Sequence, residues 1–309
     1  MFNRLILHIG DHKTGTTSVQ RYCAENHVAL RCKGIVYPGG DAQIAFGHHP
    51  VQKWLSDYKK QPRENAFSLE RAAKEWSEYF GWDLLLSSEN FRFLPVDQIR
   101  QIASFLPARS TEVVVYFRPP LTRFISGYKQ HVKSNKTRCQ TGLLEFMERW
   151  QYERVVDYHA IVARWASVFG IQAINVRSFD LAKKSLIHDF FSAISVPVSD
   201  LPAPSIASNI SPDDLSIAAL AILNKIERSD KDHTSVMNAL WDTSRAEERD
   251  FSLLKGDHYP IIRDRLLKPI ADFPAADNLG LSIEPDLSKM RPISSEALFE
   301  RIRRLEKQI

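Results

Sequence analysis

The chain has 309 residues, of which 44% are hydrophobic and 25% charged, and its formal net charge is +4. This composition is typical of a globular protein and excludes disorder, collagen and coiled coil as descriptions of the whole chain. The charge is too small to indicate nucleic acid by itself, but it is compatible with an anionic ligand held at a local basic site. No apolar run approaches the ~20 residues that span a bilayer. Three cysteines without a CxxC pattern favour a reducing compartment, so we expect a cytoplasmic protein.

Apolar runs and helical patterns alternate along the first two thirds of the chain. We predict strands at residues 4–9, 83–87, 112–117 and 171–176, and helices at residues 16–30, 69–80, 96–105 and 158–169. The N-terminal apolar stretch is read as the first strand, because it is short and lacks the cleavage site of a signal peptide. Continuous apolar strands that alternate with helices predict an α/β fold with a mostly parallel sheet flanked by helices.

The last third of the chain is predicted to be mainly helical. A proline-bearing connector at residues 201–206 precedes Ser211-Pro212-Asp213-Asp214, in which Ser211 has the pattern of an N-cap with proline at the first helical position. Residues 294–309 have the pattern of a further amphipathic helix. We therefore expect an α/β core at residues 1–200 and a helical C-terminal portion at residues 201–309 packed on it, or one single domain that contains both.

The stretch LILHIGDHKTGTT at residues 5–17 predicts a binding loop for an anion. An apolar strand runs into a loop with two glycines and then into a helix rich in hydroxyl groups. Glycines let the backbone turn with its N–H groups exposed, and the helix N-terminus adds a partial positive charge. The alternative is a surface strand–turn–helix with an incidental lysine.

This loop is not a Walker A motif. Gly10 and Gly15 have the Walker separation, but Thr16 stands where that motif has its lysine, and the lysine of this loop is Lys13. The displaced lysine argues against a loop built for a nucleoside triphosphate and magnesium.

A second stretch, VVVYFRPPLTRFISGY at residues 113–128, ends a buried strand at Arg118 and carries Ser126 eight residues later. The carboxyl edge of an α/β sheet is where such sheets bind ligands. A guanidinium at this edge can bind a phosphate through paired hydrogen bonds. The alternatives are a surface ion pair for Arg118 and an exposed helix serine for Ser126.

Together the two stretches resemble the phosphoadenosine phosphosulfate (PAPS)-dependent sulfotransferases, in particular bacterial members closer to the glycan-modifying type. In that family a K-[ST]-G-T-[ST] loop holds the 5′-phosphosulfate side, and the matching residues are Lys13, Thr14, Gly15, Thr16 and Thr17. A strand-end arginine with a serine eight residues on holds the 3′-phosphate, which implies that role for Arg118 and Ser126. Asn209 belongs to an Asn-x-Ser pattern similar to one near the nucleotide in bacterial relatives. The resemblance covers residues 4 to about 226 and implies a P-loop-type fold, PAPS as co-substrate with PAP as product, and no metal.

Sulfuryl transfer needs a base for the acceptor proton and a cation near the departing phosphate. Lys13 is the candidate cation. Glu89 follows a buried strand at the same sheet edge and is the candidate base, and glycan-modifying and bacterial members similarly carry a glutamate there. The adjacent His48 and His49 are rival bases; they point in different directions, so we expect at most one of them, His49 in our assignment, at the site.

The resemblance implies transfer of a sulfuryl group from PAPS to a hydroxyl or amine of an acceptor. Basic residues between 129 and 138 are compatible with an acidic polysaccharide or another glycan as that acceptor. The alternatives are a P-loop small-molecule kinase, a PAP-binding protein without turnover, and a nucleic-acid binder. The missing Gly-Lys-Ser/Thr argues against the first, the presence of Lys13 and Glu89 against the second, and the lack of any recognition motif against the third.

Overall fold

A computed structural model describes residues 1–57, 67–197, 201–203, 212–243 and 250–306. The chain forms two compact units. Unit 1 comprises Met1–Arg118, Tyr158–Ser205 and Asp277–Leu281, and unit 2 comprises Pro119–Asp157, Ile206–Ala276 and Ser282–Ile309. Residues 119–157 therefore group with unit 2, although the sequence places them with residues 1–200.

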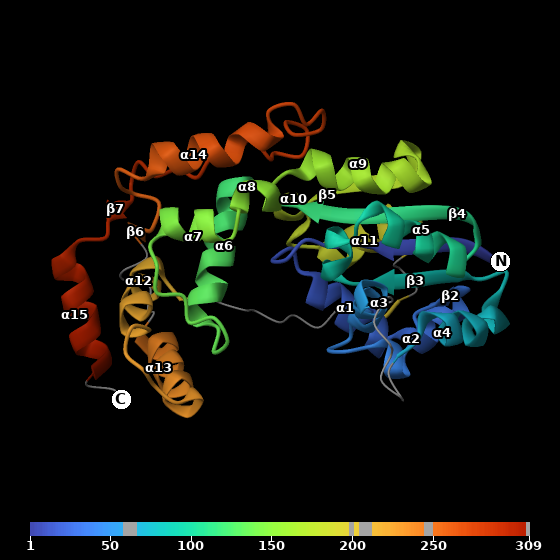
Figure 1. The fold of residues 1–309 in the computed structure, drawn as a ribbon, viewed down its shortest axis with the longest axis horizontal. Coiled ribbons are helices and arrows are strands. Elements are labelled where there is room, and N and C mark those ends of the chain that lie inside the picture. Colours follow the sequence, from blue (N-terminus) through green and yellow to red (C-terminus); the bar gives the residue numbers. More distant parts are fainter. Residues whose placement is uncertain (58–66, 198–200, 204–211, 244–249, 307–309) are drawn as a thin grey trace. The chain divides into compact units, whose positions relative to one another are not determined.

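Unit 1 is built on a five-stranded parallel sheet with the strand order β2-β3-β1-β4-β5 (Figure 1). The strands are β1 (Phe2–His8), β2 (Ile35–Val36), β3 (Asp83–Ser87), β4 (Ala108–Phe117) and β5 (Ile174–Ser178). β1 lies in the middle, with Leu7 in register with Leu86 of β3 and Val113 of β4. The predicted α/β fold with a mostly parallel sheet flanked by helices is confirmed.

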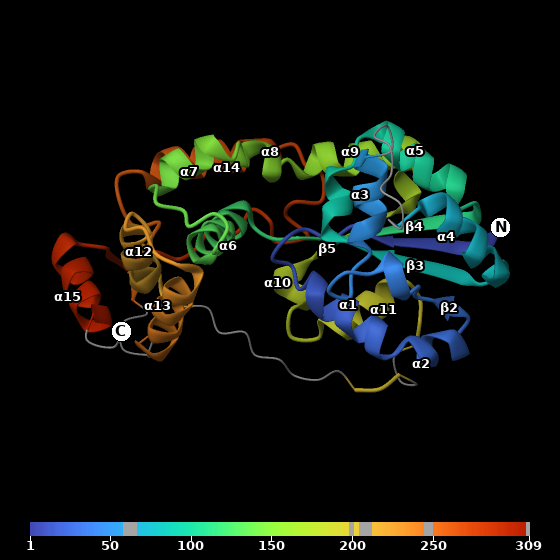
Figure 2. The same cartoon turned by 60° about the horizontal axis from the view of Figure 1, so that its bottom comes forward.

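Helices cover both faces of this sheet (Figure 2). α1 (Thr16–Glu25) and α11 (Leu186–Ala193) lie on one face, and α3 (His49–Asp57), α5 (Val96–Phe105) and α9 (Tyr158–Phe169) lie on the other. Ile6, Tyr116 and Phe190 belong to the buried core between the sheet and the first pair. A side chain of such size contributes about 1.5–3 kcal/mol when it is fully buried, so this layer holds the carboxyl edge of the sheet in place.

Several boundaries in unit 1 differ from the sequence prediction; β1 and β4, for example, begin two and four residues earlier than predicted. The helix expected at residues 16–30 divides at Asn26, whose side-chain and backbone N–H groups both donate to the Tyr22 carbonyl, and α2 (His27–Cys32) follows. The helix expected at residues 69–80 ends as α4 (Leu69–Trp76) and continues as one 3₁₀ turn, Ser77–Tyr79. Residues 171–173 form another such turn, η4, so β5 begins three residues later than predicted.

Unit 2 is mainly helical. Its helices are α6 (Pro120–Lys133), α7 (Leu143–Arg149), α8 (Tyr152–Val155), α12 (Asp214–Leu223), α13 (Asp230–Thr243), α14 (Tyr259–Leu267) and α15 (Ser295–Glu306), with the short strands β6 (Phe251–Ser252) and β7 (Arg291–Pro292). The N-cap of α12 is Asp213, whose Oδ1 accepts the backbone N–H of Ser216 at 2.8 Å. The prediction of Ser211 as this cap is therefore wrong: an aspartate two residues later supplies the acceptor, and Ser211 itself lies outside the described residues.

Across the ranges that the structure describes, no helix combines the length and the apolar character needed to cross a membrane.

Candidate functional site

The loop between β1 and α1 is held in a tight backbone conformation. Gly10, Lys13 and Gly15 have φ angles of 51°, 70° and 71°, in the left-handed region. A Cβ on Gly10 would lie 2.9 Å from Thr16 Oγ1 and 3.0 Å from Glu89 Cα. Glycine at this position therefore lets the loop approach the segment that carries Glu89.

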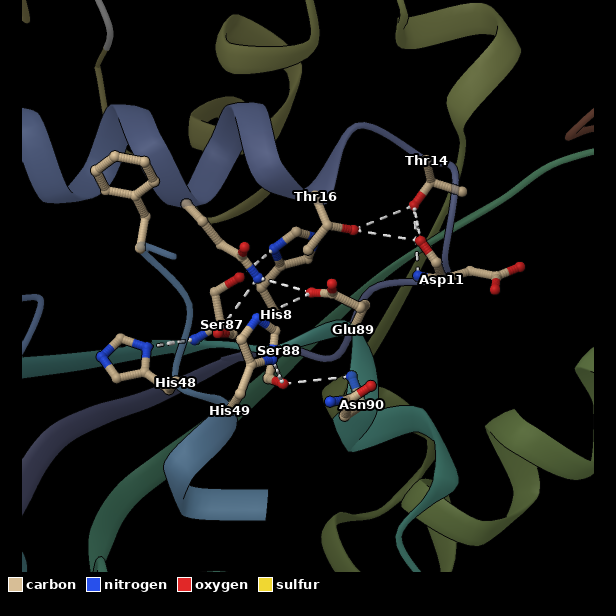
Figure 3. Close-up of polar contacts among 12 residues, drawn as sticks. His8, Asp11, Thr14, Thr16, His48, His49, Ser87, Ser88, Glu89 and Asn90 are labelled. Carbon is tan, nitrogen blue, oxygen red and sulfur yellow. Dashed lines mark hydrogen bonds and ion pairs between the residues drawn. The ribbon is translucent and has the colours of Figure 1, made fainter. Parts of the chain in front are cut away.

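Two threonine hydroxyls of the loop point inward (Figure 3). Thr14 Oγ1 donates to the Asp11 carbonyl at 2.6 Å, and Thr16 Oγ1 donates to the same oxygen at 3.3 Å. Both residues are buried, as is Asp11, whose carboxylate pairs with the buried guanidinium of Arg92. These hydroxyls fix the loop conformation in this structure.

The N-terminus of α1 has the features of an anion-binding site. The first N–H groups of any helix have no acceptor within that helix, and the N-cap here is Gly15, which provides no side-chain cap. The first turn contains no acidic residue, so the partial positive charge at this end is not offset within the turn. Thr17 in that turn and Lys13 in the loop are exposed. The arrangement fits a phosphate or sulfate group.

Glu89 lies two residues beyond the end of β3, at the start of the 3₁₀ helix η3 (Glu89–Phe93). Its Oε2 accepts a hydrogen bond from Gln20 Nε2 of α1 at 3.0 Å and lies 3.8 Å from His49 Nε2. Burial raises the pKa of Glu89, but hydrogen bonds from its own backbone N–H and from Gln20, together with His49 and His12, outweigh burial and leave the pKa below its usual value. Glu89 is therefore a carboxylate at neutral pH.

The structure separates the two adjacent histidines (Figure 3). His49 Nδ1 lies 2.8 Å from Ser88 Oγ, and the other ring nitrogen faces Glu89. His48 is fully buried: its Nδ1 accepts the Ser87 backbone N–H at 3.0 Å, and its Nε2 lies 2.9 Å from the Pro38 carbonyl. His48 thus completes the hydrogen bonding at the end of β3, and His49 is the member of the pair at the site.

A third histidine, His8, ends β1 beneath the site. It is fully buried, with Nδ1 2.8 Å from Ser87 Oγ. Burial lowers the pKa of His8 to about 4 against the opposing effect of Glu89. His8 is therefore neutral at physiological pH and adds no charge near Glu89.

Arg118, at the end of β4, reaches the loop. Its Nη1 donates to the Lys13 carbonyl at 3.2 Å, and its Nε and Nη2 each lie 3.3 Å from a carboxylate oxygen of Asp180. The guanidinium also lies 5.0 Å from the centre of the Phe179 ring. Arg118 is therefore part of the same edge of unit 1 as the Lys13 loop. In this structure the Asp180 carboxylate offsets its positive charge.

The remaining two predicted ligand residues lie outside the described part of unit 1. Ser126 lies on α6 and is half-buried within unit 2. Asn209 lies outside the described residues. Unit 1 thus brings together the 13–17 loop, Glu89, His49 and Arg118, and the functional roles of these residues, like those of Ser126 and Asn209, stay predictions.

Sequence reasoning missed several side chains that build the site, namely Gln20, Asp11, Arg92 and Asp180. Gln20 had a usable signal, because it is a polar residue beside Val19 and Cys23 on the buried face of a helix. A buried amide needs hydrogen-bond partners, which points to a polar group facing α1. The Asp11–Arg92 pair had no comparable signal, because it joins segments 81 residues apart.

A separate cavity of about 440 Å³ lies within unit 2, where Phe251, Arg291, Arg301 and Arg304 contribute to its lining. Its arginines are already engaged by acids: Arg291 by Asp250, Arg301 by Asp213 and Arg304 by Glu300. The cavity contains none of the predicted site residues. Within the described ranges, no group of three or more His, Cys, Asp and Glu residues is placed to hold a metal ion.

Comparison with known proteins gave three findings. No protein-family model matches the chain. The chain is 28% identical over 176 residues to an uncharacterized protein of Archaeoglobus fulgidus; the match covers 56% of this chain and 46% of that protein, so it spans about half of the relative's length. A sulfotransferase from Alicyclobacillus acidocaldarius has a similar structure, with a TM-score of 0.47, 16% identity, and coverage of 76% of this chain and 100% of that one.

Proposed function

We propose that the chain is a PAPS-dependent sulfotransferase that acts on a hydroxyl or amine group. The observation that carries this proposal is the pairing of two features on one helix. α1 presents an uncapped, acid-free N-terminus suited to an anion, and its Gln20 holds the Glu89 carboxylate. An anion site beside an ionised carboxylate is what transfer of an anionic group to a deprotonated acceptor requires.

Each loop residue then has a defined part. The N-terminal N–H groups of α1 and the exposed Thr17 bind the phosphosulfate end, while Thr14 and Thr16 hold the loop through the Asp11 carbonyl. Lys13 is exposed and stabilises the negative charge that develops on the departing phosphate oxygen. Arg118 binds the 3′-phosphate, exchanging its contact with Asp180 for a phosphate.

The proposed reaction is a direct displacement at sulfur. Glu89 takes the proton from the acceptor O–H or N–H group, and the acceptor atom forms a bond to sulfur. The bond between sulfur and the bridging phosphate oxygen breaks, and its electron pair leaves with PAP. This balance needs no oxidant or reductant.

The proposed acceptor group is a hydroxyl or an amine. The basic segment of residues 129–138 suggests an acidic glycan, but two of its cations already have partners in unit 2. Lys129 Nζ lies 2.5 Å from Asp214, and Arg138 pairs with Asp230. The segment therefore offers an acidic acceptor less positive charge than its sequence indicates.

Nucleotide preference is the first test of the proposal. PAP should raise the melting temperature of the chain, and ATP with magnesium should not. The reason is that the loop carries its lysine at Lys13 and has Thr16 where a Walker A motif has its lysine. Ligand binding stabilises the folded state by about 2.7 kcal/mol at a hundredfold excess over the dissociation constant. Thermal melts with each nucleotide measure this directly. A shift with ATP–magnesium and none with PAP would favour the kinase alternative and contradict the proposal.

Arg118→Ala should weaken PAP binding by about 10- to 150-fold, because a hydrogen bond to a charged group contributes about 1.5–3 kcal/mol. Calorimetric titration with PAP measures the change. Arg100→Ala, on the exposed side of α5, is the matched control and should bind PAP as wild type does. Asp180→Asn should bind PAP at least as tightly as wild type, because the competing carboxylate is gone. Unchanged PAP affinity in Arg118→Ala would show that the 3′-phosphate binds elsewhere.

A further inference from the structure

The Gln20 side chain links the anion-binding helix to Glu89. Gln20 lies one turn after Thr16 on α1 and is 1% exposed. Its Nε2 donates to Glu89 Oε2 at 3.0 Å and lies 3.5 Å from the Ser87 carbonyl. A buried amide with these two acceptors has little freedom to turn elsewhere, because an unpaired amide in this position would be costly.

Gly47 provides the space in which Gln20 and His49 meet the carboxylate. A Cβ on Gly47 would lie 2.7 Å from His49 Nε2 and 2.8 Å from Gln20 Nε2. Any side chain at residue 47 would therefore displace one of these groups. The helix α1, the loop before α3 and the end of β3 thus converge on one carboxylate.

Both side-chain contacts of this carboxylate fall on the same atom. Gln20 Nε2 lies 3.0 Å and His49 Nε2 lies 3.8 Å from Glu89 Oε2. An oxygen held by a hydrogen-bond donor is the weaker proton acceptor of the two. Oε1 has neither of these side-chain contacts, so of the two oxygens it is the one less engaged by neighbouring side chains.

From this geometry we infer that Gln20 is a positioning residue: it holds Glu89 by Oε2, directs Oε1 to the acceptor, and couples the base to the helix whose N-terminus binds the nucleotide. The inference rests on the proposed function. It places the acceptor hydroxyl or amine on the Oε1 side of Glu89. It also requires that changes at Gln20 act on Glu89 and on turnover, not on nucleotide affinity.

The test replaces the donor by an acceptor of the same size. In Gln20→Glu two carboxylates face each other at about hydrogen-bond distance, and such a pair raises the pKa of one member. Carbon NMR titration should show the two carboxyls sharing a proton with an apparent pKa above the usual 4.5, where Glu89 of wild type lies below it. Turnover should fall to about one half at that raised pKa and about tenfold one pH unit below it, and recover as the pH rises, with PAP affinity within about twofold of wild type.

Two further variants complete the design. Gln20→Met keeps the volume without a donor, so it should also raise the pKa of Glu89, and it replaces Gln20→Glu if that variant does not fold. Gln52→Glu, on the exposed side of α3, is the matched control and should leave the Glu89 titration and turnover unchanged.

The outcomes separate the inference from the proposed function. An unmoved Glu89 titration in both Gln20 variants overturns the inference, and so does a turnover loss that is equal at every pH, which is what a purely structural role would give. The pKa of Glu89 can be measured in an inactive protein. The titration therefore still tests the inference if wild type neither binds PAP nor transfers a sulfuryl group. That last result would overturn the proposed function alone.

Discussion

Glu89→Gln is expected to lower turnover by a factor of about 10²–10⁴, the usual contribution of a general base, while PAP affinity stays nearly unchanged. Glutamine keeps the shape of the side chain, and its amide oxygen can still accept the hydrogen bond from Gln20. It cannot take a proton from the acceptor. Steady-state kinetics with PAPS and calorimetric titration with PAP measure the two quantities separately.

The pH dependence of turnover gives a second readout for Glu89. Its pKa lies below the usual 4.5 because hydrogen bonds and nearby histidines outweigh the effect of burial. A base is active when deprotonated, so Glu89 is competent above its pKa and loses activity as the pH falls below 4.5. Glu89→Gln should lack that acidic limb, and its residual activity should be flat where wild-type activity falls.

Two variants assign the base between the candidates. His49→Asn keeps an oxygen acceptor for Ser88 but removes the ring nitrogen that faces Glu89, so it should cost less turnover than Glu89→Gln. Glu75→Gln, an exposed glutamate of α4 that pairs with Arg71, should behave as wild type. An inactive His49→Asn beside an active Glu89→Gln would make His49 the base and contradict our assignment.

The sequence predicted the sheet and its edge because both have local causes. All five residues of β3 are buried, and burial on both faces produces a continuous apolar run that can be recognised without the structure. Residues that follow parallel strands meet at one edge whatever the details of packing. This is why the 13–17 loop, Glu89 and Arg118 could be expected together. β2 has only two residues, too few for a pattern.

The contacts that orient the site could not be predicted, because they join segments far apart in the chain. Gln20 and Glu89 are 69 residues apart, and Arg118 and Asp180 are 62 apart. The threonines show a different limit. A run of hydroxyls predicts donors for a ligand, but the sequence does not show that the Asp11 carbonyl accepts from both Thr14 and Thr16.

Acidification from pH 6.5 to pH 4 is expected to cost about 3 kcal/mol of unfolding free energy through His48 alone. Burial is the main cause that lowers the pKa of His48 from 6.5 to about 4. Between these two values the unfolded chain binds a proton at His48 and the folded chain does not. The contribution of neutral His48 to the unfolding free energy is therefore fully present above pH 6.5 and declines as the pH falls. It stops declining near pH 4, where His48 of the folded state is protonated too.

The hydrogen bonds of His48 explain why the folded state resists the proton. Nδ1 accepts the Ser87 N–H, so the single ring proton of the neutral form lies on Nε2 and is donated to the Pro38 carbonyl. A second proton, on Nδ1, would leave the ring N–H facing the Ser87 backbone N–H, so that two donors would meet without an acceptor. The backbone N–H of His48 also donates to the Ser87 carbonyl at 2.7 Å, so protonation weakens the end of β3 one residue before Ser88 and Glu89.

His48→Asn tests this account, because the asparagine oxygen can replace Nδ1 as acceptor and does not titrate. Denaturant unfolding at pH 7 should show a variant less stable than wild type by about 1–3 kcal/mol, from the lost bond to Pro38 and lost ring packing. Between pH 6.5 and pH 4 that gap should close by about 3 kcal/mol, because only wild type carries the linked proton. His8, whose pKa is also about 4, contributes equally to both proteins and cancels in the difference.

His27→Asn, at an exposed position of α2, is the control, and its unfolding free energy should change with pH as that of wild type does. A gap between wild type and His48→Asn that stays constant with pH would show that His48 is not held neutral in the folded chain.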